Sequence, residues 1–197
     1  MSNVDLWSGQ FGDDYTTRCE KDYSPRNKFW GDVICRTKIR NVLEIGCNTG
    51  QNLDIIGEYL PKRSCAWGCD VNQKALNVLH VRHKDINAVK CSGFDLPFRD
   101  DYFDLVFTAG VLIHQQPSEI DIMMQEIIRV SHNYVLAMEY AGEIFEEIPY
   151  RGKESALFRG PYGDVYEKKY GLRLINSGIL SKEDGWDDLY FWLLSKK

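Results

Sequence analysis

The sequence lacks the features that mark several large classes of protein. No stretch of its 197 residues approaches the roughly 18 consecutive apolar residues of a membrane-spanning helix, and no basic flank followed by an apolar run opens the chain. The 24 lysines and arginines are outnumbered by 29 acidic residues, and the resulting net charge of −5 is unfavourable for tracking nucleic-acid phosphates. We therefore expect a soluble, cytoplasmic protein with a small-molecule substrate, with no nucleic-acid and no membrane partner.

The cysteines and histidines are not spaced as metal ligands. None of the six cysteines forms a C-x-x-C pair, and one close histidine pair, His80 and His83, lies beside the charged Arg82 and Lys84. No third ligand accompanies that pair, so a solvated helix surface is a better interpretation than a metal site. Several cysteines lie within apolar runs and are interpreted as free thiols in a reducing compartment. No metal is expected.

From residue 40 onward, short apolar runs alternate with helix-like segments. The pattern predicts strands at 41–45, 64–69, 86–91, 103–109 and 134–139, and helices at 51–59, 73–83 and 118–130. Because the connections are long enough for right-handed crossovers, the five strands are predicted to be parallel and to carry helices on both faces. Two β-rich runs, 172–180 and 189–194, predict an antiparallel hairpin across the polar turn 181–188.

These elements predict an α/β fold with a Rossmann-like, seven-stranded methyltransferase sheet of five parallel strands plus a C-terminal antiparallel hairpin. We expect a single domain over residues 1–197. Residues 1–40 are predicted to cover the carboxyl edge of the sheet, and residues 141–171 to form a lid-like insertion.

A glycine-containing turn follows the first predicted strand. Residues 42–50 have the sequence VLEIGCNTG, in which Gly46 and Gly50 permit a ligand to approach the backbone closely and Asn48 tolerates a positive φ. A dinucleotide fingerprint starting at Gly46 would need glycines where Asn48 and Gln51 stand. The spacing therefore weighs against an NAD-dependent enzyme.

Two acidic residues flank this turn in the predicted fold. Glu44 would point a carboxylate into the crevice, where it suits a cationic amine such as that of a methionine moiety. Asp70 ends the second predicted strand, at the position where an acid can accept both hydroxyls of an adenosine ribose. Together with the turn, the two acids predict a nucleoside ligand that carries an amino group.

Ordered motifs extend the pattern: VLEIGCNTG at 42–50, GCD at 68–70, SGFDLPF at 92–98 and FDLVF at 103–107. As a set they resemble class I S-adenosylmethionine-dependent methyltransferases over about residues 40–140. A narrower resemblance includes WSGQFGDDY at 7–15, GVLIH at 110–114, PYRG at 149–152 and DDLYFWLL at 187–194. With these flanks, the chain resembles the methylases associated with pseudaminic acid biosynthesis, bacterial proteins linked to surface-sugar gene sets.

The class resemblance implies an enzyme that uses S-adenosyl-L-methionine and releases S-adenosyl-L-homocysteine. It assigns Ser92 and Gly93 to the adenine edge, although many relatives carry Asp where this chain has Ser92, and residues 108–110 to the sulfonium. Tyr15 and Arg18 are candidates to close over the methionine carboxylate. The full cofactor set that we predict is Tyr15, Arg18, Glu44, Gly46, Cys47, Asn48, Gly50, Asn52, Asp70, Val71, Ser92, Gly93, Phe94, Thr108, Ala109 and Gly110.

The acceptor side is predicted from residues near the ends of the fourth and fifth strands. His114 is the histidine best placed to take a proton, and Glu139 and Tyr140 are further catalytic candidates. Tyr150 and Arg151 are predicted to bind a polyhydroxylated, anionic acceptor such as an acidic sugar or its nucleotide derivative.

Alternatives to this acceptor remain open in the sequence. They are a cofactor-binding protein without transferase activity and a methyltransferase for a different small metabolite. Transfer to RNA or DNA is disfavoured by the acidic balance and by the absence of an Asn/Asp-Pro-Pro-aromatic run after the fourth strand. A monomer or a homodimer is expected.

Overall fold

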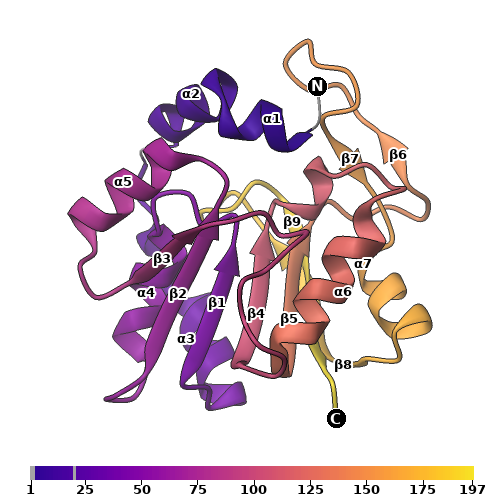
Figure 1. Cartoon of the computed structure of the whole chain (residues 1–197). Coiled ribbons are helices and arrows are strands. Elements are labelled where there is room, and N and C mark those ends of the chain that lie inside the picture. The colour runs from indigo at the N-terminus through magenta and orange to yellow at the C-terminus, as the bar shows by residue number, and fades with distance from the viewer. Residues whose placement is uncertain (1–2, 20) are drawn as a thin grey trace.

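Seven strands form one sheet in the order β3-β2-β1-β4-β5-β9-β8 (Figure 1). The computed structural model describes residues 3–19 and 21–197. The strands β1 (Asn41–Ile45), β2 (Cys65–Asp70), β3 (Asn87–Lys90), β4 (Phe103–Ala109) and β5 (Ser131–Glu139) pair in parallel, as predicted. β1 and β4 have their predicted bounds, whereas β5 begins at residue 131 instead of 134 because Ser131 pairs with Phe103 across an irregular step in the ladder.

The predicted C-terminal hairpin is also confirmed. β8 (Arg173–Leu180) and β9 (Leu189–Ser195) are antiparallel, and β9 lies between β5 and β8 and is antiparallel to both. Most of β9 is buried, whereas β8 begins with exposed residues, as an edge strand does. The fold class therefore agrees with the seven-stranded methyltransferase sheet.

Helices cover both faces of the sheet (Figure 1). α3 (Asn27–Thr37), α4 (Gln51–Tyr59) and α5 (Gln73–Arg82) share one apolar core with Val42 and Phe107. α6 (Ile120–Val130), α7 (Tyr162–Asp164) and the π-helix η3 (Val165–Lys169) share the other core with Leu43 and Val106. Neighbouring residues of β1 and β4 thus face opposite cores, which is the alternation expected of strands buried on both sides.

Two N-terminal helices, α1 (Asn3–Ser8) and α2 (Gln10–Arg18), cross the carboxyl ends of the parallel strands (Figure 1). The Asn72 Nδ2 atom donates to the carbonyl of Trp7 at 3.1 Å and to Asp13 Oδ1 at 2.9 Å. The Thr16 hydroxyl donates to Asn48 Oδ1 at 3.2 Å. These contacts tie the helices to the start of α5 and to the turn after β1.

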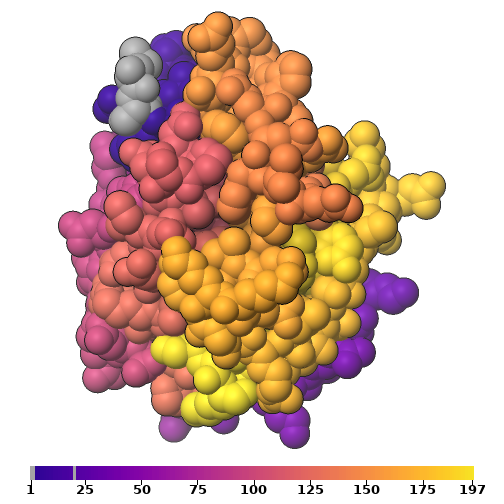
Figure 2. All heavy atoms as spheres, turned by 90° about the vertical axis from the view of Figure 1, so that its right-hand side faces the viewer, coloured from indigo at the N-terminus to yellow at the C-terminus, as the bar shows by residue number. Residues whose placement is uncertain are grey.

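The first part of segment 141–171, up to about residue 160, stands beside the N-terminal helices at the same end of the molecule (Figure 2), whereas Tyr162 and Tyr166 lie in the core with α6. The segment contains the short strands β6 (Glu146–Glu147) and β7 (Phe158–Arg159) as well as α7 and η3. Asn3 Nδ2 donates to the carbonyl of Ser155 at 3.2 Å and so joins α1 to this segment. Within residues 3–19 and 21–197, no helix has the length and apolar character needed to span a membrane.

Candidate active site

The turn after β1 adopts the backbone conformation that its residues predict. Gly46, Asn48 and Gly50 have φ angles of 70°, 47° and 85°. A Cβ atom on Gly46 would lie 2.5 Å from Val111 Cγ2. The backbone N–H of Gly46 donates to the carbonyl of Cys69 on β2 at 2.8 Å. Glycine at position 46 is therefore required by both the backbone angle and the close packing.

Asp70 holds this turn from the end of β2. Its carboxylate accepts the backbone N–H groups of Asn48 and Asn72, each at 2.8 Å. Burial raises the pKa of Asp70, and the backbone donors of Asn72 and Asn48 oppose the rise. Because each carboxylate oxygen retains a further lone pair, the side chain can still accept hydroxyl groups from a ligand.

A buried polar chain leads from η1 (Ser24–Arg26) to β1. Arg26 Nη1 donates to Asn52 Oδ1 at 2.8 Å, and Asn52 Nδ2 donates to Glu44 Oε1 at 2.7 Å. Burial raises the pKa of Glu44 to about 8, although Asn52 and Arg26 both act to lower it. Glu44 Oε2 has no hydrogen-bond partner among the described residues. A buried carboxylate oxygen without a partner is a site for a cationic donor.

Arg26 is not among the residues predicted from the sequence, although its side chain is buried in the wall beside Glu44. The guanidinium lies 4.3 Å from the ring centroid of Tyr23 and 4.0 Å from that of Trp186. Its Nε atom donates to the carbonyl of Gly185 at 2.9 Å, a contact across 159 positions of the chain. No local pattern marks this arginine, because its burial depends on the distant turn before β9.

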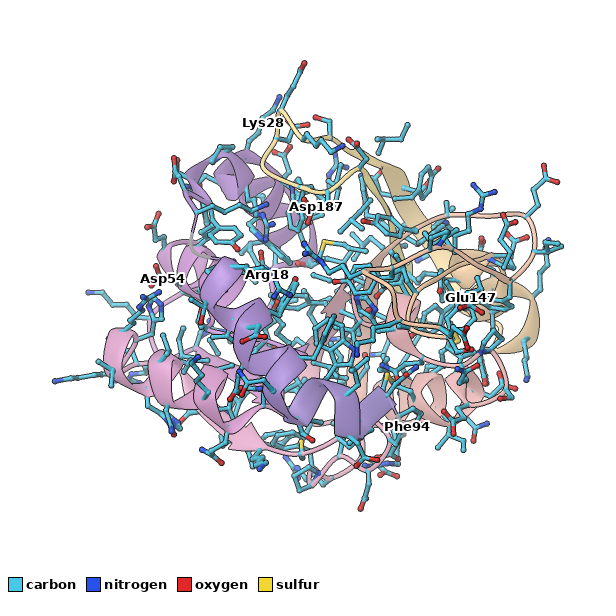
Figure 3. All side chains as sticks on the ribbon, turned by 90° about the horizontal axis from the view of Figure 1, so that it is seen from above. Arg18, Lys28, Asp54, Phe94, Glu147 and Asp187 are labelled. Atoms are coloured by element: carbon cyan, nitrogen blue, oxygen red, sulfur yellow. The ribbon has the colours of Figure 1, made fainter. Side chains whose placement is uncertain are left out.

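These groups line one cavity of about 560 Å³, a size within the range of small-molecule and cofactor sites. Every predicted cofactor residue except Gly50 and Thr108 lines this cavity. The cavity is also lined by Trp7 and Asn72, which are not in the predicted cofactor set. Figure 3 looks onto this end of the molecule, with Phe94 near α1 and Arg18 at the far end of α2, facing the turn that carries Asp187.

Gly50 and Thr108 lie outside the cavity lining for packing reasons. Gly50 caps α4, and a Cβ atom there would lie 3.0 Å from Leu79 Cδ1 of α5. The Thr108 side chain is buried, and its hydroxyl donates to Glu139 Oε1 at 2.7 Å. Both residues therefore shape the backbone beneath the cavity without reaching its surface.

Glu139 also lies beneath the cavity. Its carboxylate is fully buried and accepts the Thr108 hydroxyl and the backbone N–H groups of Val111 and Ile113, the latter two at 3.3 and 3.2 Å. Burial raises the pKa of Glu139 to about 7. The predicted catalytic role of Glu139 is not supported by this placement, because β5 points the side chain at the connection after β4 instead of into the cavity.

The predicted adenine edge is formed by backbone and small side chains. Ser92 uses its hydroxyl locally, to accept the N–H of Phe94 at 3.3 Å. A Cβ atom on Gly93 would lie 2.9 Å from Met123 Cε and 3.0 Å from Ile45 Cγ2, so a larger residue there would have to displace the Met123 side chain. Ser92, Gly93 and Phe94 all line the cavity.

His114, in η2 (Leu112–His114), lines the cavity with one nitrogen fixed. Its Nδ1 atom lies 2.6 Å from the carbonyl of Ala156, and a carbonyl can only accept, so Nδ1 carries the proton. Burial lowers the pKa of His114 to about 4, so the ring is neutral at pH 7. The rings of Trp7 and Tyr150 lie 4.5 and 5.2 Å from the imidazole. The remaining lone pair is on Nε2.

The mouth of the cavity carries exposed cations. Arg18 and Arg151 both line it, and their guanidiniums contact the rings of Phe11 and Tyr150 at 5.8 and 5.9 Å. Burial raises the pKa of Tyr150 and both arginines oppose that rise, so both cations lie near its phenol. Within residues 3–19 and 21–197, neither arginine forms an ion pair with a carboxylate. Tyr140, at the end of β5, also lines the cavity.

Residues 42–133 match a family described as a methyltransferase domain. Among curated proteins, the chain is 30% identical to a probable tRNA methyltransferase 9B of Mus musculus and 29% identical to that of Homo sapiens, in each case over 113 residues. These matches cover 54% of this chain and only 24% and 23% of the two relatives. The chain therefore corresponds to a minor part of these relatives.

Solved structures have the same fold. A SAM-dependent methyltransferase from Aquifex aeolicus has a TM-score of 0.67 at 14% identity, covering 92% of this chain and 97% of that one. The magnesium protoporphyrin IX methyltransferase from Synechocystis PCC 6803, crystallised with bound SAM, has a TM-score of 0.71 at 12% identity, covering 100% and 98%. The domain match over residues 42–133 and the fold shared with these structures agree with the predicted class I methyltransferase fold.

Proposed function

We propose that this protein transfers the methyl group of S-adenosylmethionine to a small, anionic acceptor bound at the mouth of the cavity. The observation that carries this proposal is the pair of exposed guanidiniums, Arg18 and Arg151, beside Tyr150 at a cavity lined by the cofactor residues. Guanidinium groups that pair with no carboxylate among the described residues are well suited to bind a carboxylate or phosphate of a ligand.

The cavity residues fit the cofactor group by group. Asp70 suits the ribose hydroxyls, and the free Oε2 atom of Glu44 suits the ammonium. The carboxylate of an amino acid lies one carbon from its ammonium, so the cation that receives it belongs near Glu44. Arg26 lies near Glu44, because Asn52 hydrogen-bonds to both side chains. We therefore assign Arg26 to the cofactor carboxylate and Arg18 to the acceptor.

The bound cofactor supplies an activated methyl group on a sulfonium, and the chain's part is to align the acceptor with it. Ala109 and Gly110 leave room at the cavity wall for the methyl group. If the attacking atom carries a proton, His114 Nε2 accepts it while Nδ1 stays bonded to Ala156. The first part of segment 141–171, which supplies Tyr150 and Arg151, acts as a lid over the acceptor, whereas α7 and η3 pack in the core below it.

For the acceptor itself, we propose an acidic sugar or its nucleotide derivative. The motifs at 7–15, 110–114, 149–152 and 187–194, which resemble the pseudaminic acid-associated methylases, support this assignment. Two tyrosines of the cavity lining, Tyr140 and Tyr150, add hydrogen-bonding groups for a polyhydroxylated ligand, and Tyr150 lies near both guanidiniums.

Calorimetry and a transfer assay test the two halves of the proposal. S-adenosylhomocysteine should bind wild-type protein and Arg151→Ala with affinities within about threefold of each other, and should not bind Asp70→Ala measurably. With labelled S-adenosylmethionine and a panel of acidic sugars and sugar nucleotides, Arg151→Ala should raise the KM for the acceptor about tenfold or more. Lys153→Ala, in the same turn, is the matched control.

Equal loss of cofactor and acceptor binding in Arg151→Ala would argue against an acceptor site at the mouth of the cavity. Binding of S-adenosylhomocysteine by wild type, combined with no transfer to any small molecule in a cell extract, would favour a cofactor-binding protein without transferase activity. Transfer to a metabolite that is neither a sugar nor a sugar nucleotide would keep the activity and replace the acceptor.

A second candidate is transfer to tRNA, favoured by the names of the mouse and human relatives. The net charge of −5 weighs against transfer to tRNA, and so does the match to only 24% of the mouse relative. Incubation with labelled cofactor and total tRNA separates the candidates, since label in the tRNA fraction that survives protease treatment would support the second.

A further inference from the structure

The connection after β4 is built around a buried negative charge. Thr108 Oγ1 and the N–H groups of Val111 and Ile113 all donate to the Glu139 carboxylate. Gly110, between them, has a φ of 68° and donates its own N–H to the carbonyl of Met138 at 2.8 Å. A side chain of β5 thus satisfies donors that the start of η2 would otherwise leave unpaired.

The same connection forms part of the cavity wall. Ala109 and Gly110 line the cavity, and His114 follows at the end of η2. The orientation of His114 depends on this backbone, because its ring must reach the carbonyl of Ala156 on another segment. Glu139 itself does not line the cavity, so any effect on the site passes through the connection.

We propose that Glu139 is a positioning residue for methyl transfer, whose carboxylate fixes residues 108–114 and thereby orients His114 toward the acceptor. The inference rests on the proposed function, in which His114 faces the acceptor. It extends that function to the Glu139 carboxylate, which lies outside the cavity. It also gives a physical reason for an acidic residue at a fully buried strand end.

The surroundings of Glu139 contain few charges to compete with this role. Tyr162 of α7 and Tyr166 of η3 interact electrostatically with it, and Tyr190 is its neighbour in β9. The groups that hydrogen-bond to Glu139 are a hydroxyl and backbone N–H groups, none of them cationic. Its pKa of about 7 means that the carboxylate gains a proton as the pH falls below neutrality, and the connection then loses one of its acceptors.

The experiment is side-chain ¹⁵N NMR of His114 in the full chain with bound S-adenosylhomocysteine. In wild type, the ring should keep its proton on Nδ1 and stay neutral until the pH approaches 4. In Glu139→Gln, an amide N–H₂ replaces one carboxylate oxygen and faces either the Ile113 N–H or the Thr108 and Val111 donors, none of which it can accept from. The His114 ring should then populate both tautomers, and its pKa should rise toward the ordinary 6.5. Glu119→Gln, an exposed carboxylate before α6, should match wild type.

The kinetic counterpart separates positioning from a purely structural role. With an acceptor identified by the transfer assay, Glu139→Gln should lower kcat about tenfold to 100-fold, because small misplacements of a catalytic group have effects of this size. Its Kd for S-adenosylhomocysteine should change by less than about threefold. In wild type, kcat should fall as Glu139 gains a proton below about pH 7. This decrease should be absent in Glu139→Gln.

Thr108→Val, which removes one donor without adding charge, is the second variant in case Glu139→Gln does not fold. Unchanged His114 tautomer and pKa in either folded variant, with only the melting temperature lowered, would overturn the proposal. Failure of wild type to bind S-adenosylhomocysteine or to transfer methyl groups would instead count against the proposed function, because the His114 resonances can be followed without turnover.

Discussion

At the scale of single residues, Glu44 is the group whose ionisation the cofactor should change. Its pKa is raised to about 8, so most of the carboxyl is protonated at pH 7 in the ligand-free protein. A bound ammonium beside Oε2 favours the charged form and lowers that pKa. Binding of S-adenosylhomocysteine at pH 7 should therefore release up to about one proton, measured by titration calorimetry in buffers of different ionisation enthalpy.

The variant Glu44→Gln should abolish this proton release and weaken binding roughly tenfold to 100-fold, the usual effect of losing a charged hydrogen bond. Its amide oxygen can still accept from Asn52, which limits the structural damage. Glu58→Gln, exposed on α4, is the control. Proton release that persists in Glu44→Gln would mean that another group titrates on binding.

At the scale of elements, the cover formed by α1 and α2 depends on Asn72. Its Nδ2 atom holds the Trp7 carbonyl and Asp13, while its Oδ1 atom caps α5 by accepting the N–H of Ala75 at 2.9 Å. Asn72→Asp keeps the cap and replaces both docking donors with a negative charge. Hydrogen exchange in residues 3–19 should accelerate about tenfold or more, since two hydrogen bonds are lost.

The core strands of Asn72→Asp should keep their protection, because the α5 cap is retained. Gln73→Glu, one position along the same helix, changes charge without touching the cover and should exchange like wild type. Equal acceleration in the cover and in the core strands would indicate global destabilisation instead of undocking.

At the scale of the whole molecule, buried titratable groups set the dependence of stability on pH. For Glu44 and Glu139 the folded pKa lies above the unfolded value of 4.5, so their contribution to stability falls as the pH rises from 4.5 to about 8. For His114 the folded pKa of about 4 lies below the unfolded 6.5, so stability on the order of 3 kcal/mol is lost as the pH falls from 6.5 to 4.

Between pH 4.5 and 6.5 the two glutamates outweigh the one histidine, so these groups make the ligand-free protein most stable near pH 4.5 and less stable as the pH rises toward 8. Because the cofactor ammonium relieves the cost of ionising Glu44, the rise in melting temperature on adding S-adenosylhomocysteine should be larger at pH 8 than at pH 6. Thermal denaturation across pH, in wild type and Glu44→Gln, measures both effects. A rise that does not depend on pH in wild type would contradict the assigned role of Glu44.

The sequence by itself determined the five parallel strands, the helices between them, the C-terminal hairpin and the conformation of the turn after β1. β1, β4 and α4 have their predicted bounds, because each is a short, locally patterned segment. Gly46 and Asn48 adopt the positive φ angles expected of them, since such angles depend on the residue itself. The location of Glu44 and Asp70 at the cavity was predictable, because both lie at the carboxyl ends of neighbouring parallel strands.

Only the tertiary structure decided that Arg26 reaches the cavity and that Glu139 does not. Arg26 enters it because Gly185 and Trp186, far along the chain, enclose the guanidinium. Glu139 is one residue from Tyr140, yet Tyr140 lines the cavity and Glu139 turns beneath it to hold Val111 and Ile113. Successive side chains of a strand point in opposite directions, and which of the two faces the ligand depends on how the connecting segments pack.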